Sequence, residues 1–148
     1  YTPVEIVDFI LRAADDVSKK HFGKGLTDEG VCILDPFAGT STFTVRLLQS
    51  GLIKPEDLAR KYANELFATE IMLLAYYVSA VNIETTYNAL REEAALRNGE
   101  PAPEYVPFTN IALADTFQIH EEGDIQTSIS SARTTRPSSA RRRRPSTW

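Results

Sequence analysis

The stretch Val31–Phe43 constrains the fold more than any other part of this chain. It reads Val-Cys-Ile-Leu-Asp-Pro-Phe-Ala-Gly-Thr-Ser-Thr-Phe. The four apolar residues at its start predict a strand that is buried on both faces and ends at Asp35. Pro36 stops the pairing because it has no N–H to donate to a sheet. Gly39 allows the backbone to turn sharply and a ligand to come close.

A helix is expected directly after this turn. Thr40, Ser41 and Thr42 are good N-cap residues for a helix that runs through Val45 and Leu48. A strand, an acidic tip, a glycine turn and a helix N-terminus in this order are typical of an open α/β sheet. Such a sheet binds a nucleotide-like ligand at its carboxyl edge.

Two later segments repeat the pattern of a strand that ends in an acid. They are Asn64–Glu70 and Asn110–Asp115. A carboxylate has two acceptor oxygens, so Glu70 can hold both hydroxyls of a ribose, and Asp115 can accept from an adenine amino group. Alternatively, Glu70 only starts the next helix, where the helix dipole favours an acid. We expect Asp35, Glu70 and Asp115 to line one site.

Apolar side chains follow two of these acids. Ile71 and Met72 can cover one face of an adenine, and Phe117 can stack on the ring. The run from Met72 to Arg97 is helix-rich. Its large apolar residues are dense enough to predict burial of most of them: Leu73, Leu74, Tyr76, Tyr77, Val81 and Ile83. Cys32, the single cysteine, is expected to be a small buried hydrophobe.

The first residues predict a capped helix that packs on the sheet. Thr2 can cap, Pro3 fits the first helical position and Glu5 can complete a capping box. An apolar stripe follows at helical spacing: Val7, Ile10, Leu11, Ala14 and Val17. A further short helix is expected to open at Pro55, with acids in its first turn.

The loop Asp35-Pro36-Phe37-Ala38-Gly39, with Phe43 behind it, resembles the cofactor loop of S-adenosylmethionine-dependent amino-methyltransferases that act on DNA. That family's pattern is Asp-Pro-x-x-Gly-x-Gly-x-Phe, and Ser41 stands at its second glycine. A Cβ there is expected to crowd the ligand-facing backbone. Tyr1-Thr2-Pro3 ahead of a helix resembles the N-terminal cofactor motif of adenine-specific members, beside the methionine end of the cofactor.

Residues 1–117 as a whole resemble the methyltransferase region of type ISP restriction–modification enzymes. The resemblance implies a Rossmann-like α/β methyltransferase fold with an incomplete parallel sheet of three strands flanked by helices. It also implies S-adenosylmethionine as the cofactor and DNA as the partner of the full-length enzyme. The residues it assigns to the cofactor are Tyr1, Thr2, Pro3, Asp35, Pro36, Phe37, Ala38, Gly39, Ser41, Phe43, Glu70, Ile71, Asp115 and Phe117.

The sequence departs from this family at the reacting end of the site. Amino-methyltransferases carry an Asn/Asp/Ser-Pro-Pro-Tyr/Phe loop after the third strand, which accepts from the target amino group and stacks on a flipped base. None of the eight prolines here is followed by another proline. We therefore assign no catalytic residue and expect no methyl transfer by this chain alone.

The composition predicts a body, residues 1–120, and a Ser-, Thr- and Arg-rich tail, residues 121–148. All 20 acidic residues lie at or before Asp124, with ten Lys and Arg, so this part has a net charge of 10 − 20 = −10. The six Arg after Asp124 include the run Arg141, Arg142, Arg143 and Arg144. The tail's composition predicts disorder. Its arginines can contact nucleic-acid phosphates, and a shifted reading frame would explain the tail equally well.

Other functions stay open at this point. One is a catalytically inactive fragment that binds nucleic acid non-specifically through the Arg-rich tail. Another is a methyltransferase-like domain for a different substrate, and a nicotinamide-dependent enzyme is disfavoured because the glycine fingerprint is missing. We expect no metal site, since His21 has no partner at ligand spacing. The sequence has no membrane-length apolar run and no signal peptide, which predicts a cytoplasmic protein.

Overall fold

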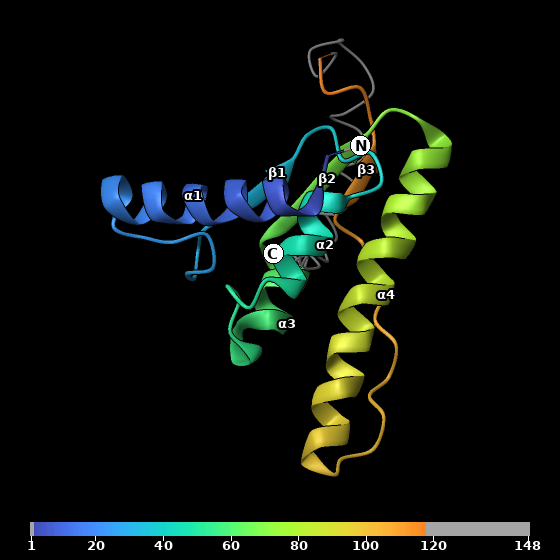
Figure 1. The fold of residues 1–148 in the computed structure, drawn as a ribbon. Coiled ribbons are helices and arrows are strands. Elements are labelled where there is room, and N and C mark those ends of the chain that lie inside the picture. Colours follow the sequence, from blue (N-terminus) through green and yellow to red (C-terminus); the bar gives the residue numbers. More distant parts are fainter. Residues whose placement is uncertain (1, 118–148) are drawn as a thin grey trace, which may run out of the picture. The chain divides into compact units, whose positions relative to one another are not determined.

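Helices and strands follow one another in the order that the sequence predicts. The computed structural model describes residues 2–117, and residues 1–116 form one compact unit. Its elements are α1 (Val4–Phe22), β1 (Ile33–Asp35), α2 (Thr42–Gln49), α3 (Pro55–Asn64), β2 (Leu66–Glu70), α4 (Leu73–Asn98) and β3 (Ile111–Leu113) (Figure 1). The prediction of an α/β fold is confirmed. The predicted tail, with Arg141–Arg144, lies outside the described residues.

The three strands form one parallel sheet in the order β1-β2-β3. Ile33 pairs with Leu66, and Ala68 pairs with Ile111. This confirms the predicted three-stranded parallel sheet and brings all three carboxyl ends to one edge. The strands are shorter than predicted, because β1 starts only at Ile33 and β3 covers three residues.

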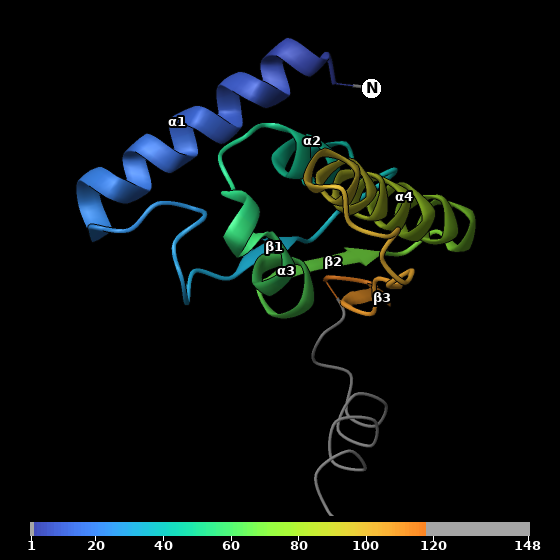
Figure 2. The same cartoon turned by 90° about the horizontal axis from the view of Figure 1, so that it is seen from below.

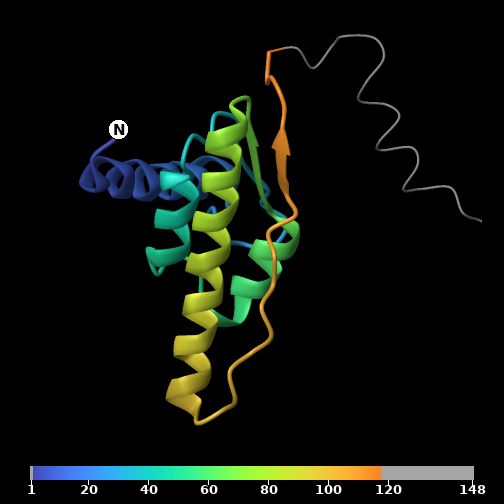
Figure 3. The same ribbon diagram turned by 90° about the vertical axis from the view of Figure 1, so that its right-hand side faces the viewer.

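Helices α2 and α4 cover one face of the sheet (Figures 2 and 3). Side chains of β2 alternate accordingly: Leu66, Ala68 and Glu70 are buried, whereas Phe67 is 37% exposed. The core lies between this face and the helices. It contains Val7, Leu11, Ala38, Leu47, Leu48, Ile53, Tyr62, Leu66, Ala68, Ile83, Tyr87, Phe108 and Ile111.

The prediction that the first strand is buried on both faces is wrong. Leu34 is 56% exposed, and Cys32 is exposed as well. The reason is topological. The order β1-β2-β3 advances in one direction, so successive right-handed crossovers place their helices on the same side of the sheet. The opposite face, which carries Leu34 and Phe67, is left uncovered by the described helices.

Helix α1 starts differently from the prediction and packs elsewhere. Pro3 rather than Thr2 is its N-cap residue, and no side chain makes a capping hydrogen bond. The helix packs along α2, where Val7 and Leu11 are buried. Val17, predicted on the same stripe, is 54% exposed because α1 extends beyond its partner (Figure 1).

Helix α4 is the longest element of the described chain. Its 26 residues span roughly 39 Å at about 1.5 Å per residue, whereas the five residues of β2 span about 17 Å. The last turns of α4 extend beyond the sheet (Figures 1 and 3). Leu73, Leu74, Tyr77 and Val81 are exposed, contrary to prediction, and Ile83 is fully buried. In the part of the chain that the structure describes, no helix has the length and apolarity to span a membrane.

Candidate ligand site at the carboxyl edge

Glu70, at the end of β2, joins the two loops that leave the edge of the sheet. The Gly39 N–H donates to its Oε2 at 2.7 Å, and the Met72 N–H donates to its Oε1 at 2.9 Å. The side chain belongs to the face that packs on the helices and is 8% exposed. Glu70 thus fixes the loop after β1 against the turn after β2.

Asp35, at the end of β1, is the second carboxylate of the edge. Its Oδ1 accepts from the Phe37 N–H at 3.3 Å. Burial raises the pKa of Asp35; the Phe37 N–H acts against this, and the negative charge of Glu70 adds to it. Glu70 therefore lies near enough for its negative charge to disfavour the ionised form of Asp35. Acids held together in this way are more frequent at functional sites than elsewhere.

The loop between β1 and α2 is held by hydrogen bonds from the neighbouring strands. The Ala38 N–H donates to the Thr69 carbonyl at 3.0 Å. The Pro36 carbonyl accepts from the hydroxyls of Thr69 and Thr116, at 2.8 and 2.6 Å. These two hydroxyls also lie 2.9 Å apart. One carbonyl therefore joins the ends of all three strands and keeps the edge in a single arrangement.

The space beside Gly39 is open. Its φ is +55°, and a Cβ built on it would meet no atom within 4 Å. Large apolar side chains are exposed on the loops nearby: Phe37 (59%), Ile71 (62%) and Met72 (65%). A backbone that a ligand can approach, two carboxylates and exposed apolar side chains are thus combined at one edge. Such an edge can take a flat, partly apolar ligand that carries hydroxyl groups.

Ser41 lies differently from what the sequence predicts. It is the N-cap residue of α2, but it has φ +62° and makes no side-chain capping bond. The residue is fully buried, and its hydroxyl is hydrogen-bonded to that of Ser79 in α4. The side chain therefore points into the protein, against α4. This orientation does not support the expected crowding of the ligand-facing backbone by its Cβ, which stays a prediction.

The remaining predicted residues have varied surroundings. Thr2 is half-buried and Pro3 is exposed at the start of α1, and neither takes part in the hydrogen bonds around Glu70. Phe43 and Asp115 are half-buried. The Ala114 N–H donates to the Glu70 carbonyl at 3.0 Å, which brings the end of β3 beside β2. Tyr1 is outside the described residues, and Phe117 belongs to a separate unit, residues 117–148.

Three solved structures contain a segment similar to this chain. The ATP-dependent type ISP restriction–modification enzyme LlaBIII bound to DNA matches with 45% identity and a TM-score of 0.71 over 83% of this chain. The chain is similar to a piece of a type ISP restriction–modification enzyme. A nuclease-deletion mutant of the type ISP enzyme LlaGI, in complex with a DNA substrate mimic, matches with 49% identity and a TM-score of 0.67 over 79% of the chain.

The third structure is a DrdV–DNA complex, with 43% identity and a TM-score of 0.64 over 78% of the chain. This chain covers 8% of the LlaBIII chain, 9% of the LlaGI chain and 10% of the DrdV chain. It thus corresponds to about a tenth of each of these proteins. No protein-family model matches the sequence. No curated protein matches it.

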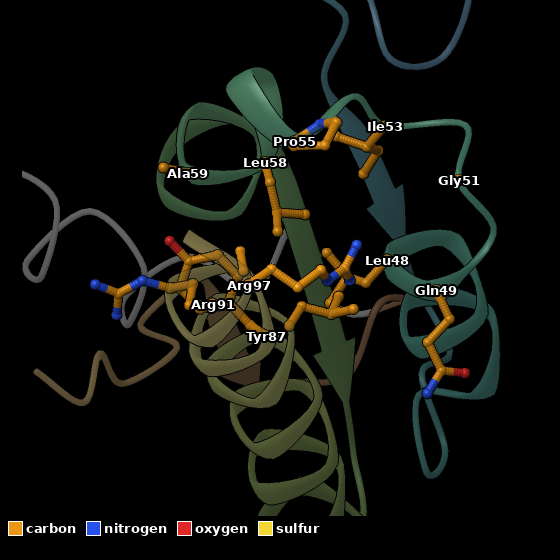
Figure 4. A pocket seen from close by; sticks show the side chains of 12 residues that line it. Leu48, Gln49, Gly51, Ile53, Pro55, Leu58, Ala59, Tyr87, Arg91 and Arg97 are labelled. Carbon is orange, nitrogen blue, oxygen red and sulfur yellow. The ribbon is translucent and has the colours of Figure 1, made fainter. Parts of the chain in front are cut away.

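A cavity lies away from the carboxyl edge, between the end of α2, the start of α3 and the second half of α4 (Figure 4). Its volume is about 380 Å³. Leu48, Ile53, Leu58 and Tyr87 line it, and none of its twelve lining residues is acidic. Among residues 2–117, no three His, Cys, Asp or Glu side chains are placed to hold a metal ion. The carboxyl edge therefore remains the better candidate for a ligand with hydroxyl and amino groups.

The sequence analysis missed Thr69, Thr116 and Ser79. The two threonines are direct neighbours of Glu70 and Asp115, so their position beside predicted strand tips could have marked them. Ser79 carries no such local signal, because it lies inside a helix, 38 residues from Ser41.

Proposed function

We propose that this chain is the S-adenosylmethionine-binding part of an adenine-N6 DNA methyltransferase of a type ISP restriction–modification system, with a Rossmann-like methyltransferase fold. One observation carries the proposal. The open Gly39 loop follows Asp35 directly and donates to Glu70 through the Gly39 N–H, within a segment that is 45% identical to part of a type ISP enzyme.

The residues at the edge fit the parts of this cofactor. An ionised carboxylate has about four lone-pair positions, and the backbone N–H groups of Gly39 and Met72 use two of those on Glu70. The other two are sufficient for the hydroxyls of one ribose. Phe37 and Ile71 supply apolar surface for an adenine, and Asp115 is proposed to accept from its amino group. Asp35 and Gly39, with Thr2 and Pro3, are proposed to hold the methionine part.

When bound, S-adenosylmethionine supplies a methyl group on a positively charged sulfur. The residues of this chain would bind and orient the cofactor, and the carboxylates would favour a cationic ligand. The printed sequence has no Pro-Pro-aromatic loop, so we propose binding without transfer. DNA is accordingly proposed as the partner of the larger enzyme. Labelled methyl transfer to DNA by the purified chain would contradict this part of the proposal.

Calorimetry with S-adenosylhomocysteine tests the proposal directly. We expect binding by the unmodified chain and a loss of at least about tenfold in Glu70→Ala, because two hydrogen bonds to a carboxylate are removed. Glu93→Gln is the control, since Glu93 makes an exposed ion pair with Arg97 on α4. Circular dichroism establishes that each variant is folded. Unchanged affinity in Glu70→Ala would remove Glu70 from the site, and tighter binding of NAD would favour the nicotinamide alternative.

A further inference from the structure

Ser41 has an unusual backbone conformation for its residue type. Within residues 2–117 it is the one non-glycine residue with positive φ, at +62°. Residues with a Cβ are disfavoured in this left-handed region. Such a conformation persists where the surrounding structure enforces it, and such residues cluster at active sites, ligand clamps and switch regions. The contacts of Ser41 therefore show what holds the turn.

Those contacts come from α4. The Ser41 hydroxyl is hydrogen-bonded to the hydroxyl of Ser79, and both side chains are fully buried. One residue before Ser41, the Thr40 carbonyl accepts from Asn82 Nδ2 at 3.0 Å. Ser79 and Asn82 are three residues apart and so lie on one face of the helix. Two successive loop residues are thus fastened to the same face of α4.

The other side of the turn is fastened to the sheet. Gly39 donates to Glu70, and the Ser41 N–H donates to the Ala38 carbonyl at 2.6 Å, which closes the turn. The backbone between Ala38 and Ser41 is therefore held by α4 at one end and by the end of β2 at the other. The direction of the Gly39 N–H and its open side depends on both attachments.

We propose that Ser79, assisted by Asn82, is a positioning residue for the ligand loop. Its hydroxyl holds Ser41 in the left-handed conformation, so that a serine here serves in place of a glycine and Gly39 faces the ligand. The link to a ligand rests on the function proposed above. Ser41 and Ser79 then act as one unit, so removing either hydroxyl has the effect of removing both.

Hydrogen exchange of the ligand-free full chain tests the attachment without any ligand. In Ser79→Ala we expect faster exchange of the amides from Gly39 to Val45. Ser50→Ala is the matched control, because Ser50 also makes a hydroxyl hydrogen bond on α2, to the Leu47 carbonyl at the opposite end. It should leave the exchange of residues 39–45 unchanged. Equal exchange in Ser79→Ala and the unmodified chain would overturn the proposal.

Calorimetry with S-adenosylhomocysteine tests the positioning. Ser79→Ala and Ser41→Gly should each weaken binding by about threefold to tenfold, and the double variant should be no weaker than either single one. Ser41→Gly leaves α4 intact and suits the left-handed backbone, so it keeps the test valid if Ser79→Ala unfolds. Tighter binding in Ser41→Gly would mean that Ser41 obstructs the ligand, and unchanged binding in both single variants would mean a purely structural role; either result overturns the proposal.

The two proposals fail in different ways. If the unmodified chain binds no S-adenosylhomocysteine, the methyl-donor function is rejected, and positioning of that ligand is rejected with it. Faster exchange in Ser79→Ala would then still support the attachment of the loop to α4.

Discussion

Acidic side chains lie at both ends of the sheet, and the electrostatic surroundings of the two ends differ. At the amino end, Glu65 lies just before β2 and accepts from Lys61 at 2.8 Å and from the Gly30 N–H at 2.8 Å, with Arg60 as a further donor. Burial acts against the charged form, but these donors outweigh it and lower the pKa of Glu65 to about 2. Its charge is stabilised by the fold.

At the carboxyl end, the donors to Asp35 and Glu70 described above are backbone N–H groups, and the pKa of Asp35 is raised. The cations beside Glu65 stabilise its charged form, whereas burial and, to a smaller extent, the charge of Glu70 disfavour the charged form of Asp35. The fold retains Asp35 at the edge where the loops are most open. This difference, rather than the mere presence of acids, is the best reason to place the ligand at the carboxyl end.

The largest expected effect concerns Lys61, the buried cation that donates to Glu65 at the amino end of the sheet. Lys61 is fully buried and donates to the carbonyls of Asp28 and Val31, at 2.9 and 2.7 Å, as well as to Glu65. Lys61→Met should lower the free energy of unfolding by about 3 kcal/mol, because it leaves buried acceptors without their donor. Urea unfolding measures this loss.

The matched control for Lys61→Met is Arg97→Met. Arg97 and Glu93 form a pair at the same i, i+4 spacing, but both side chains are more than half exposed. Exposed pairs of this kind contribute at most about 0.5 kcal/mol. An equal loss of unfolding free energy in both variants would show that the contacts of Lys61 contribute no more to stability than an exposed ion pair does.

The second effect is the pH dependence that Glu65 causes. Its pKa in the folded chain is about 2, below its ordinary value of 4.5. A lowered carboxylate pKa gives stability that is fully present above the ordinary value and is lost as the pH falls toward the folded value. Acid titration followed by circular dichroism should show this loss between about pH 4.5 and pH 2. Glu65→Gln should flatten the profile in that range; an unchanged profile would contradict the assignment.

The smallest expected effect is an increase in stability, and it concerns Asp35 at the carboxyl end of the sheet. Because its pKa is raised, ionised Asp35 destabilises the fold at neutral pH. Asp35→Asn should therefore increase the free energy of unfolding by about 0.5–1 kcal/mol while weakening the binding of S-adenosylhomocysteine. Thermal unfolding and calorimetry on one preparation measure both. A lower free energy of unfolding in Asp35→Asn would contradict the inferred electrostatic difference between the two ends of the sheet.

Local patterns in the sequence were enough to predict the order of the elements and the acids at the strand ends. Pro36 and Gly39 end the apolar run and predict the turn after the first strand. Pro55 predicts the start of a helix, which the structure confirms. These features depend on neighbouring residues alone, and so they can be seen without the fold.

Features that depend on distant partners could not be predicted. The exposure of Leu34 depends on which face the crossover helices cover, and hence on the order of the strands. The attachment of Ser41 depends on a serine in α4, and the joining of the strand ends depends on Thr69 and Thr116. The burial of the Ser41 side chain against α4 could consequently not be predicted. The ligand roles of Asp35, Glu70 and Asp115 stay predictions.

The uncovered face of the sheet affects how mutational scans of this chain should be interpreted. Leu34 and Phe67, which are 56% and 37% exposed, belong to that face. Polar substitutions there should be nearly silent in the 148-residue chain. In a longer protein whose additional residues cover the face, the same substitutions would bury a polar group and reduce stability. The measured effect of a substitution at these two positions therefore depends on whether additional residues cover the face. Values from the 148-residue chain and from a longer protein should not be pooled.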